Sequence, residues 1–279
     1  MVLPTSHTLV AHNATSVPYF AFPAFDDIPF VRHGFSTRLG GVSQGIFESM
    51  NLSFTRGDRE EDVLENFKRF CASIGSDYRN VVVSAQEHHT AVLAVSKDDC
   101  GRGVTRARGY TDIDGLMTDE PGVVLCTQYA DCVPLFFVDP IRRVVATSHA
   151  GWKGTVAQIG RVTVERMEEV YGCRREDILV GIAPSIGPCC FEVDAPVKEE
   201  FAALPFADES IIRDDGNEKY HIDLWETNRR ILLKAGILPE HITVNDLCTK
   251  CHAATFWSHR ATGGQRGSLA AFIAITEEE

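Results

Sequence analysis

A pair of apolar stretches joined by a short loop constrains the fold of this chain more than any other feature. The stretches are Val133–Val138 and Arg143–Ser148, with Asp139–Arg142 between them. Two apolar runs on either side of a short polar loop indicate an antiparallel β-hairpin. Continuing the pairing outward from this loop places Cys132 directly opposite His149, with their Cβ atoms ~4.5–5.5 Å apart on one face.

The predicted neighbours Cys132 and His149 are compatible with two kinds of chemistry. A thiolate and an imidazole at this separation can bind one zinc ion, or they can form a nucleophile and its base. A buried cysteine beside a hydrogen-bonded histidine is the plainer interpretation of such a pair taken alone. The pairing also depends on the turn, because a loop at Pro140-Ile141 keeps it and a loop at Asp139-Pro140 removes it.

Another histidine favours the metal interpretation. His88 and His89 lie at the break between two strand-like runs, in the segment "SAQEHHTAVLAV". Adjacent residues of a strand point to opposite faces, so at most one of the two can enter a given site. One of them, together with Cys132 and His149, would supply three ligands and leave the fourth position of a tetrahedral zinc ion open, as catalysis requires.

The rest of the chain contains helical and strand-like segments in an irregular order. Helices are predicted over Asp58–Gly75, Thr155–Gly172, Asp194–Leu204 and Asp223–Gly236. Besides the hairpin, strands are predicted over Val81–Ala85, Ala91–Val95, Gly122–Thr127, Ile178–Ala183 and Leu269–Ile275. Strands outnumber helices without regular alternation, which predicts an α+β fold with mixed sheets. No linker or repeat is visible, so residues 1–279 are expected to form a single domain.

The charge and the apolar runs exclude several classes of protein. The formal net charge is -12, and an acidic surface repels nucleic-acid phosphates. No apolar run reaches the length of a transmembrane helix, and the N-terminus lacks a signal-peptide pattern. We therefore expect no nucleic-acid or membrane partner and a cytoplasmic location, in which the 9 cysteines stay reduced.

Two cysteine motifs are less specific. "CTKCH" at Cys248–His252 matches the pattern of covalent haem attachment, but the export that this attachment needs is not indicated. Cys189 and Cys190 are adjacent, which is the wrong spacing for a zinc knuckle. Packing is the default interpretation of these cysteines, with an accessory redox or metal role as the alternative.

A glycine-rich loop at Phe35–Ser53 is a candidate anion site. Its glycines permit tight turns, and Ser36, Arg38 and Asn51 offer hydrogen-bond donors. It matches neither a dinucleotide-binding nor a Walker pattern, so an ordinary surface loop is the alternative.

Six segments that occur in a fixed order are more specific than any single motif. They are "STRLGGVSQGIFESMNLS", "QEHH", "DGLMTDEPGVVLCTQYADCVPLFF", "SHAGWKG", "APSIGPCCFEV" and "NDLCTKCHAATFWSHR". Together they resemble the laccase-domain family, also described as multicopper polyphenol oxidase-like, as peptidoglycan editing factor and as purine nucleoside phosphorylase. The resemblance covers nearly the whole chain.

The resemblance implies a fold, a metal site and an activity. The fold would be a β-sandwich with helices on the outside, in α-β-β-α layers. The activity would be phosphorolysis of adenosine- and inosine-type purine nucleosides, together with adenosine deamination. The metal would be zinc, with copper as the less favoured alternative. The implied site residues are His88, Cys132 and His149 for the metal and catalysis, and Ser36, Arg38 and Asn51 for phosphate or the nucleoside.

Other functions stay open at this stage. Cys132 as nucleophile and His149 as base would make a metal-free hydrolase or amidase, for which peptidoglycan precursors are candidate substrates. A copper-dependent polyphenol oxidase fits less well, because several coppers need many histidines and only 10 occur. A non-catalytic partner-binding module would not need a three-ligand site. For deamination, Asp131 is a candidate proton shuttle by position alone.

Overall fold

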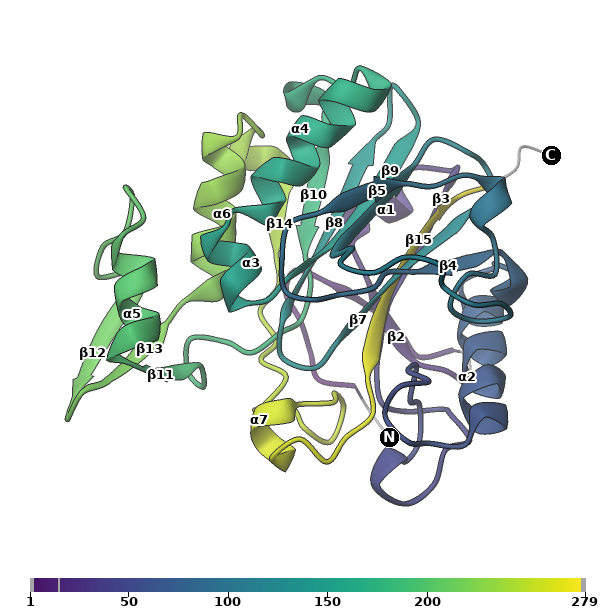
Figure 1. Ribbon diagram of the computed structural model, residues 1–279, viewed down its shortest axis with the longest axis horizontal. Coiled ribbons are helices and arrows are strands. Elements are labelled where there is room, and N and C mark those ends of the chain that lie inside the picture. The colour runs from purple at the N-terminus through teal and green to yellow at the C-terminus, as the bar shows by residue number, and fades with distance from the viewer. Residues whose placement is uncertain (1–2, 15, 277–279) are drawn as a thin grey trace.

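The computed structural model describes residues 3–14 and 16–276, and within them two six-stranded sheets pack face to face (Figure 1). The first sheet has the order β1 (Val10–His12), β2 (Tyr19–Ala21), β3 (Val31–Ser36), β15 (Leu269–Ile275), β7 (Val124–Tyr129) and β4 (Val81–Val83). The second has the order β14 (Ile242–Val244), β10 (Leu179–Ile182), β8 (Val133–Asp139), β9 (Val144–Ala150), β6 (Gly115–Thr118) and β5 (Val92–Ala94). Each contains parallel and antiparallel pairs, so the predicted mixed sheets are confirmed.

The alternation of side chains along the strands creates the layers. Phe136 of β8 belongs to the apolar cluster between the sheets, which also contains Ile273 of β15. Its neighbour Phe137 points the other way and packs in a cluster with Leu232 of helix α6 (Leu224–Lys234). On the outer face of the first sheet, Phe272 lies against Phe67 of helix α2 (Glu60–Ser73). Helices therefore cover both outer faces, which confirms the α+β class and the α-β-β-α order.

The remaining helices are short or lie on one side. They are α1 (Pro23–Asp26), α3 (Trp152–Val156), α4 (Ile159–Tyr171), α5 (Ala195–Ala202) and α7 (His259–Thr262), with 3-10 turns at Gly45–Phe47, Tyr78–Asn80, Lys97–Asp99, Arg175–Asp177 and Pro239–His241. The helix expected over Thr155–Gly172 is divided into α3 and α4 at Gln158, which has a left-handed backbone with φ +60°. Among the described residues, no helix combines the length and apolar character that a membrane crossing requires.

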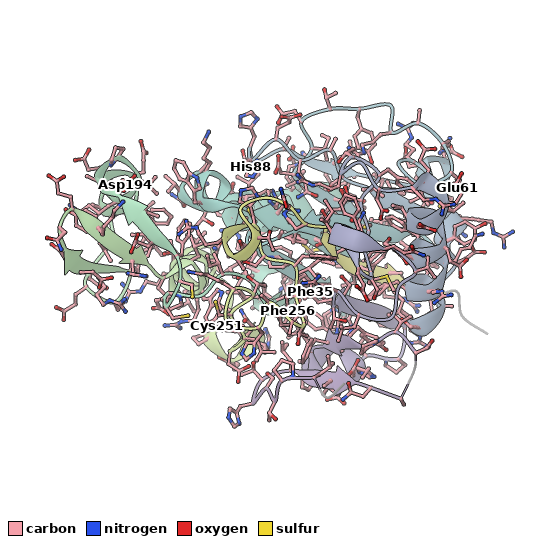
Figure 2. The ribbon with its side chains drawn as sticks, turned by 90° about the horizontal axis from the view of Figure 1, so that it is seen from below. Phe35, Glu61, His88, Asp194, Cys251 and Phe256 are labelled. Carbon is pink, nitrogen blue, oxygen red and sulfur yellow. The ribbon has the colours of Figure 1, made fainter. Side chains whose placement is uncertain are left out.

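A small third sheet extends from one side of the molecule. It has the order β11 (Glu192–Asp194), β13 (Lys219–Ile222) and β12 (Ile212–Gly216), and α5 packs on it (Figure 1). Asp194 of this sheet and Glu61 of α2 lie at opposite ends of the molecule (Figure 2). These strands were not predicted, because β12 is polar and mostly exposed and β13 has only one fully buried residue.

The predicted hairpin is formed by β8 and β9, but its register was predicted incorrectly. Asp139 stays in the strand and pairs with Val144, so the loop spans residues 140–143. The Asp139 side chain accepts backbone hydrogen bonds from Ile141 and Arg142 at 2.9 and 2.8 Å, which fixes the loop in this position. Pro134 is consequently the direct partner of His149. The register differs by two residues, and a two-residue shift keeps every side chain on its face of the sheet.

Candidate metal centre and its cavity

Three side chains with metal-binding atoms meet where the chain passes from the first sheet to the second. Cys132 lies between β7 and β8, His149 lies in β9, and His88 lies in the loop after β4. Sγ of Cys132 is 4.0 Å from Nε2 of His88, and the ligand atoms of all three lie within 4.8 Å of one another. We call these residues the triad. His89 is not part of it, because its Nδ1 lies 2.6 Å from Asp112 in an exposed pair.

Asp114 positions two members of the triad. Its carboxylate is fully buried just before β6, and one oxygen lies 2.8 Å from Nδ1 of His149. The other nitrogen of that ring, Nε2, is therefore left for the centre of the site. Backbone N–H groups of residues 87–89 donate to the same carboxylate at 2.9–3.1 Å. These bonds hold His88 in a left-handed conformation with φ +66°, which is unfavourable for a residue with a side chain.

Gly151 leaves a space at the centre of the triad. A Cβ atom at this position would lie 2.8 Å from His88 Cδ2, 3.2 Å from Cys132 Sγ and 3.5 Å from His149 Cε1. Any larger residue would therefore crowd His88 and Cys132 and contact His149. Two nitrogens and one sulfur around such a space fit a zinc ion that keeps one position open.

Burial and mutual charge set the protonation of the triad. Burial raises the pKa of the Cys132 thiol, but the facing His149 outweighs this effect and the pKa falls to about 6. Burial lowers the pKa of His149, whereas the Cys132 thiolate and Asp114 raise it to about 9. The pKa of Asp114 is lowered, because hydrogen bonds from His149 and the backbone outweigh its burial. The sulfur is thus favoured as thiolate, the form that binds metals or attacks carbon.

Asp131, the candidate proton shuttle, has both carboxylate oxygens in hydrogen bonds. Thr249 Oγ1 donates to one at 2.7 Å, and the backbone N–H of Arg260 donates to the other at 2.7 Å. Its own backbone is left-handed, with φ +85°. Asp131 therefore connects the segment that carries Cys132 to the loop around Thr249.

A polar cavity of about 170 Å³ adjoins the triad, and we call it the polar lobe. Arg56, Arg108 and Arg266 contribute to its wall, together with serine, threonine and glutamine side chains. Nε of Arg108 and Nε of Arg266 are buried and have no hydrogen-bond partner among the described residues. Arg266 is 7% exposed, and burial together with the neighbouring Arg56 lowers its pKa to about 10. Guanidinium groups gathered without carboxylates are suited to bind an anion.

A second cavity of about 420 Å³ has two members of the triad in its wall, and we call it the apolar lobe. Phe191, Trp152, Ile186 and Leu224 supply aromatic and aliphatic surface. Arg266 lines both lobes, and so do His88 and Cys132 of the triad. An anion in the polar lobe and an apolar ring in the second lobe would therefore meet at the triad.

The predicted phosphate-binding residues of the glycine-rich loop line neither lobe. Ser36 Oγ is buried and accepts from the backbone N–H of Ala270 at 2.8 Å. The Arg38 guanidinium donates to the carbonyls of Glu48 and Ala253 and lies 3.8 Å from the Trp257 ring centroid.

Asn51 is likewise buried and hydrogen-bonded, but it is one step from the polar lobe. Its Oδ1 accepts from the backbone N–H groups of Ser53 and Ser268 at 3.2 and 2.9 Å. Both serines line the polar lobe. Asn51 thus supports the wall of the lobe from behind.

Sequence reasoning missed several residues around the centre. Asp114 is the first residue of the segment "DGLMTDEPGVVLCTQYADCVPLFF", but nothing in that segment indicated that its carboxylate contacts His149. The arginines of the polar lobe come from three distant segments, so no local sequence pattern predicts that they lie together. The four cysteines at 189, 190, 248 and 251 were treated as separate, whereas their sulfur atoms form one group within 4.8 Å.

Several known proteins resemble the chain in sequence and in fold. A family model described as multi-copper polyphenol oxidoreductase laccase matches residues 32–276. The chain is 39% identical over 248 residues to a Bacillus subtilis (strain 168) protein named purine nucleoside phosphorylase YlmD, which covers 88% of both chains. It resembles the crystal structure of YlmD from Geobacillus stearothermophilus, with 36% identity, a TM-score of 0.89 and coverage of 95% and 98% of the two chains. The structure of the hypothetical protein YfiH from Bacillus licheniformis gives 32% identity, a TM-score of 0.90 and coverage of 95% and 99%.

Proposed function

Because the chain belongs to the multi-copper polyphenol oxidoreductase laccase family, and because its relatives are named purine nucleoside phosphorylases, we propose that it catalyses phosphorolysis of purine nucleosides. Adenosine and inosine are the substrates we expect, with inorganic phosphate as the second substrate. One observation carries the proposal: an arginine-lined lobe and an apolar lobe share His88 and Cys132 of the triad as a common wall.

The polar lobe suits the phosphate. Arg266 and Arg108 each have an Nε–H that no group in the described part of the chain accepts, and a phosphate oxygen could accept both. Serine hydroxyls of the same wall, such as Ser53 and Ser268, can donate further hydrogen bonds. Ser36, Arg38 and Asn51 would then act indirectly, by holding the loop and strand behind this wall.

The apolar lobe suits the nucleoside. Phe191 and Trp152 offer faces on which a purine can stack. With the base there and phosphate in the polar lobe, the ribose would lie beside the triad. A phosphate oxygen would then form a bond to C1′ while the C1′–N bond breaks and its electron pair leaves with the base. The two lobes contribute by holding both reactants in line.

We infer that the triad holds zinc. A zinc ion bound there would supply a Lewis acid at the junction of the two lobes. The chain's part is to present Cys132 as thiolate and to aim Nε2 of His149 inward through the Asp114 contact. Copper in the manner of multicopper oxidases is not supported by the donors, because neither potential metal group among the described residues has more than two histidines.

One observation favours a second candidate, a metal-free hydrolase. His149 lies between Cys132 and the Asp114 carboxylate, an order that also occurs in cysteine nucleophile sites. That mechanism gives His88 no part. Replacing His88 by Ala would therefore leave a Cys–His hydrolase active, whereas it would remove a zinc ligand and abolish the zinc enzyme.

The test is to incubate the chain with adenosine or inosine, with and without phosphate, and to separate the products. We expect free base and ribose 1-phosphate only when phosphate is present, and none from Cys132→Ala or His88→Ala. Inosine formed from adenosine without phosphate would reveal the deamination that the sequence resemblance implies. If the wild type forms no product in either condition, the nucleoside proposal is wrong.

A further inference from the structure

The four cysteines at 189, 190, 248 and 251, here called the cysteine cluster, lie outside the triad and its proposed reaction. Their sulfur atoms lie within 4.8 Å of one another, and Cys251 Sγ is 3.5 Å from Sγ of both Cys189 and Cys190. All four are free thiols. Thiolates around one tetrahedral zinc ion, with Zn–S bonds of ~2.3 Å, stand about 3.8 Å apart. The spacing of the cluster is therefore that of ligands around a single ion.

Strand pairing brings the cluster together. β10 and β14 are parallel neighbours in which Val180 pairs with Ile242, and the bridge Ser185–Cys248 continues the alignment past the strand ends. Two loops thus leave the same edge of the sheet side by side, and each carries two of the cysteines. Cys251 lies on the same half of the molecule as the small third sheet (Figure 2). Two Cys pairs on adjacent loops are a frequent arrangement in structural zinc sites. Cys248 and Cys251 have the usual spacing of such a pair, whereas Cys189 and Cys190 are consecutive and meet the others only through the fold.

The backbone around Cys248 is shaped to the sulfur atoms. The N–H of Gly187 donates to Cys248 Sγ at 3.2 Å. A side chain at Gly187 would approach Cys248 Cβ to 3.2 Å and the Trp225 ring to 2.9 Å, so only glycine fits without a shift. A backbone N–H that points at sulfur stabilises a thiolate, the form that binds a metal.

Alternatives to a metal leave part of the cluster unexplained. Apolar packing accounts for buried cysteines, but only Cys248 is buried, and Cys189 and Cys251 are exposed. A disulfide would use two sulfurs, and Cys251 is equally close to two different candidates. One ion satisfies all four at once. Four thiolates are soft ligands that select zinc over magnesium, calcium or manganese.

We propose that Cys189, Cys190, Cys248 and Cys251 bind one structural zinc ion. The site has four protein ligands and no open position, so it does not activate water. Its position indicates that it stabilises a wall of the apolar lobe, because Ile186 and Phe191 flank the first cysteine pair and both line that lobe.

The second loop leads to the same place. Thr249, between Cys248 and Cys251, donates to Asp131, the residue before Cys132. Arg260, which lines the apolar lobe after the second cysteine pair, donates to the carbonyl of Cys190 at 3.4 Å and to that of Glu192 at 2.9 Å. The zinc ion would join the two loops that form one wall of this lobe.

The first test uses the wild-type chain, so it does not depend on the folding of a variant. Each cysteine is followed by alkylation and peptide mapping, with and without a zinc chelator. We expect Cys189 and Cys251 to react slowly despite their exposure and to become reactive when the chelator is added. Cys100, half-buried and outside both groups, is the matched control, and its rate should not respond to the chelator.

The second test separates this site from the triad by metal analysis. We expect the chain with Cys248→Ser and Cys251→Ser to contain one zinc less than wild type, and Cys132→Ser to retain the zinc of the cysteine cluster. Cobalt bound to Cys132→Ser should then show the strong thiolate-to-cobalt absorption of a four-sulfur site. Unchanged zinc content in the double variant, a disulfide within the cluster, or iron in place of zinc would each overturn the proposal. Absence of nucleoside activity would not, since that outcome concerns the triad.

Discussion

The triad and the cysteine cluster are two candidate metal sites in one chain. They differ in their ligands, in their access to a cavity and in the groups that orient those ligands. The triad mixes two imidazoles with one thiolate, adjoins two cavities and is oriented by the buried Asp114. The cysteine cluster has four thiolates, lies at the surface and is oriented by a backbone N–H. An open position beside a cavity favours chemistry, whereas a closed shell of sulfur favours holding loops together.

The two sites also differ in what supports them. The triad takes His149 from strand β9 and its other two members from the segments that follow β4 and β7. The pairing of β6 with β9 sets His149 beside Asp114, so a register shift there would separate the two. The cysteine cluster lies on loops beyond the ends of β10 and β14. Strand pairing no longer holds these loops together, and a bound ion would do so instead. Substitutions should therefore act on reaction chemistry at the first site and on cavity shape at the second.

The largest effect is expected from Asp114→Asn. The amide cannot carry the negative charge that balances His149 and that accepts three backbone N–H groups. Loss of a partner behind a metal ligand typically costs about 10–100-fold in metal affinity or activity. We expect kcat/KM and zinc affinity of the triad to fall by this factor, measured by steady-state phosphorolysis and by competition with a chelator.

The matched control is Asp112→Asn. Asp112 pairs with His89 in an exposed contact two residues away, so its removal should change stability and activity little. Equal effects of the two substitutions would show that Asp114 has no special part, and the difference between the two metal sites would lose its main support.

The sequence predicts the contacts of the metal centre within one hairpin better than its contacts between segments that lie far apart in the chain. Cys132 was predicted directly opposite His149 from the hairpin alone, whereas the observed partner of His149 is Pro134. Cys132 lies just before β8 and still approaches His149, because a register shift of two residues keeps the strand on the same face. The error itself arose from Asp139, whose side chain caps the loop while its backbone stays in the strand. Only tertiary context decides between those two roles for an aspartate.

Contacts between distant segments were less predictable. The cysteine cluster depends on the parallel pairing of β10 with β14, and spacing along the chain does not indicate such pairing. The glycine-rich loop was predicted to bind an anion because it offers hydrogen-bond donors. The guanidinium of Arg38 instead donates to backbone carbonyls of the fold. Arg266 lacks any local motif, and its importance appears only when its burial and its unpaired Nε are known.

A second prediction compares Arg266 with Arg38. Arg266→Gln should raise the KM for phosphate by about 10–100-fold, since a hydrogen bond to a charged group is worth about 1.5–3 kcal/mol. The same substitution should change the melting temperature little, because it removes the repulsion from Arg56 but also the hydrogen bonds of the guanidinium to Gly267 and Ser268. Steady-state kinetics with varied phosphate and thermal unfolding measure the two effects.

Arg38→Gln should show the opposite pattern. It removes hydrogen bonds to two carbonyls and the contact with the Trp257 ring, so it should lower the melting temperature and leave the phosphate KM near that of wild type. A rise in phosphate KM for Arg38→Gln alone would return the anion site to the glycine-rich loop, as the sequence first suggested.

The smallest effect on catalysis is expected at the cysteine cluster. In the chain with Cys248→Ser and Cys251→Ser, the loops that carry Ile186 and Phe191 lose their common ion, so the apolar lobe should hold the nucleoside less well. We expect a few-fold rise in nucleoside KM and a lower melting temperature, because loss of a ligand of the folded state reduces stability. The kcat and the phosphate KM should change little, since the triad and the polar lobe keep their own contacts. A large fall in kcat with an unchanged nucleoside KM would instead mean that the cysteine cluster affects the triad through the hydrogen bond between Thr249 and Asp131. The two sites would then not act independently.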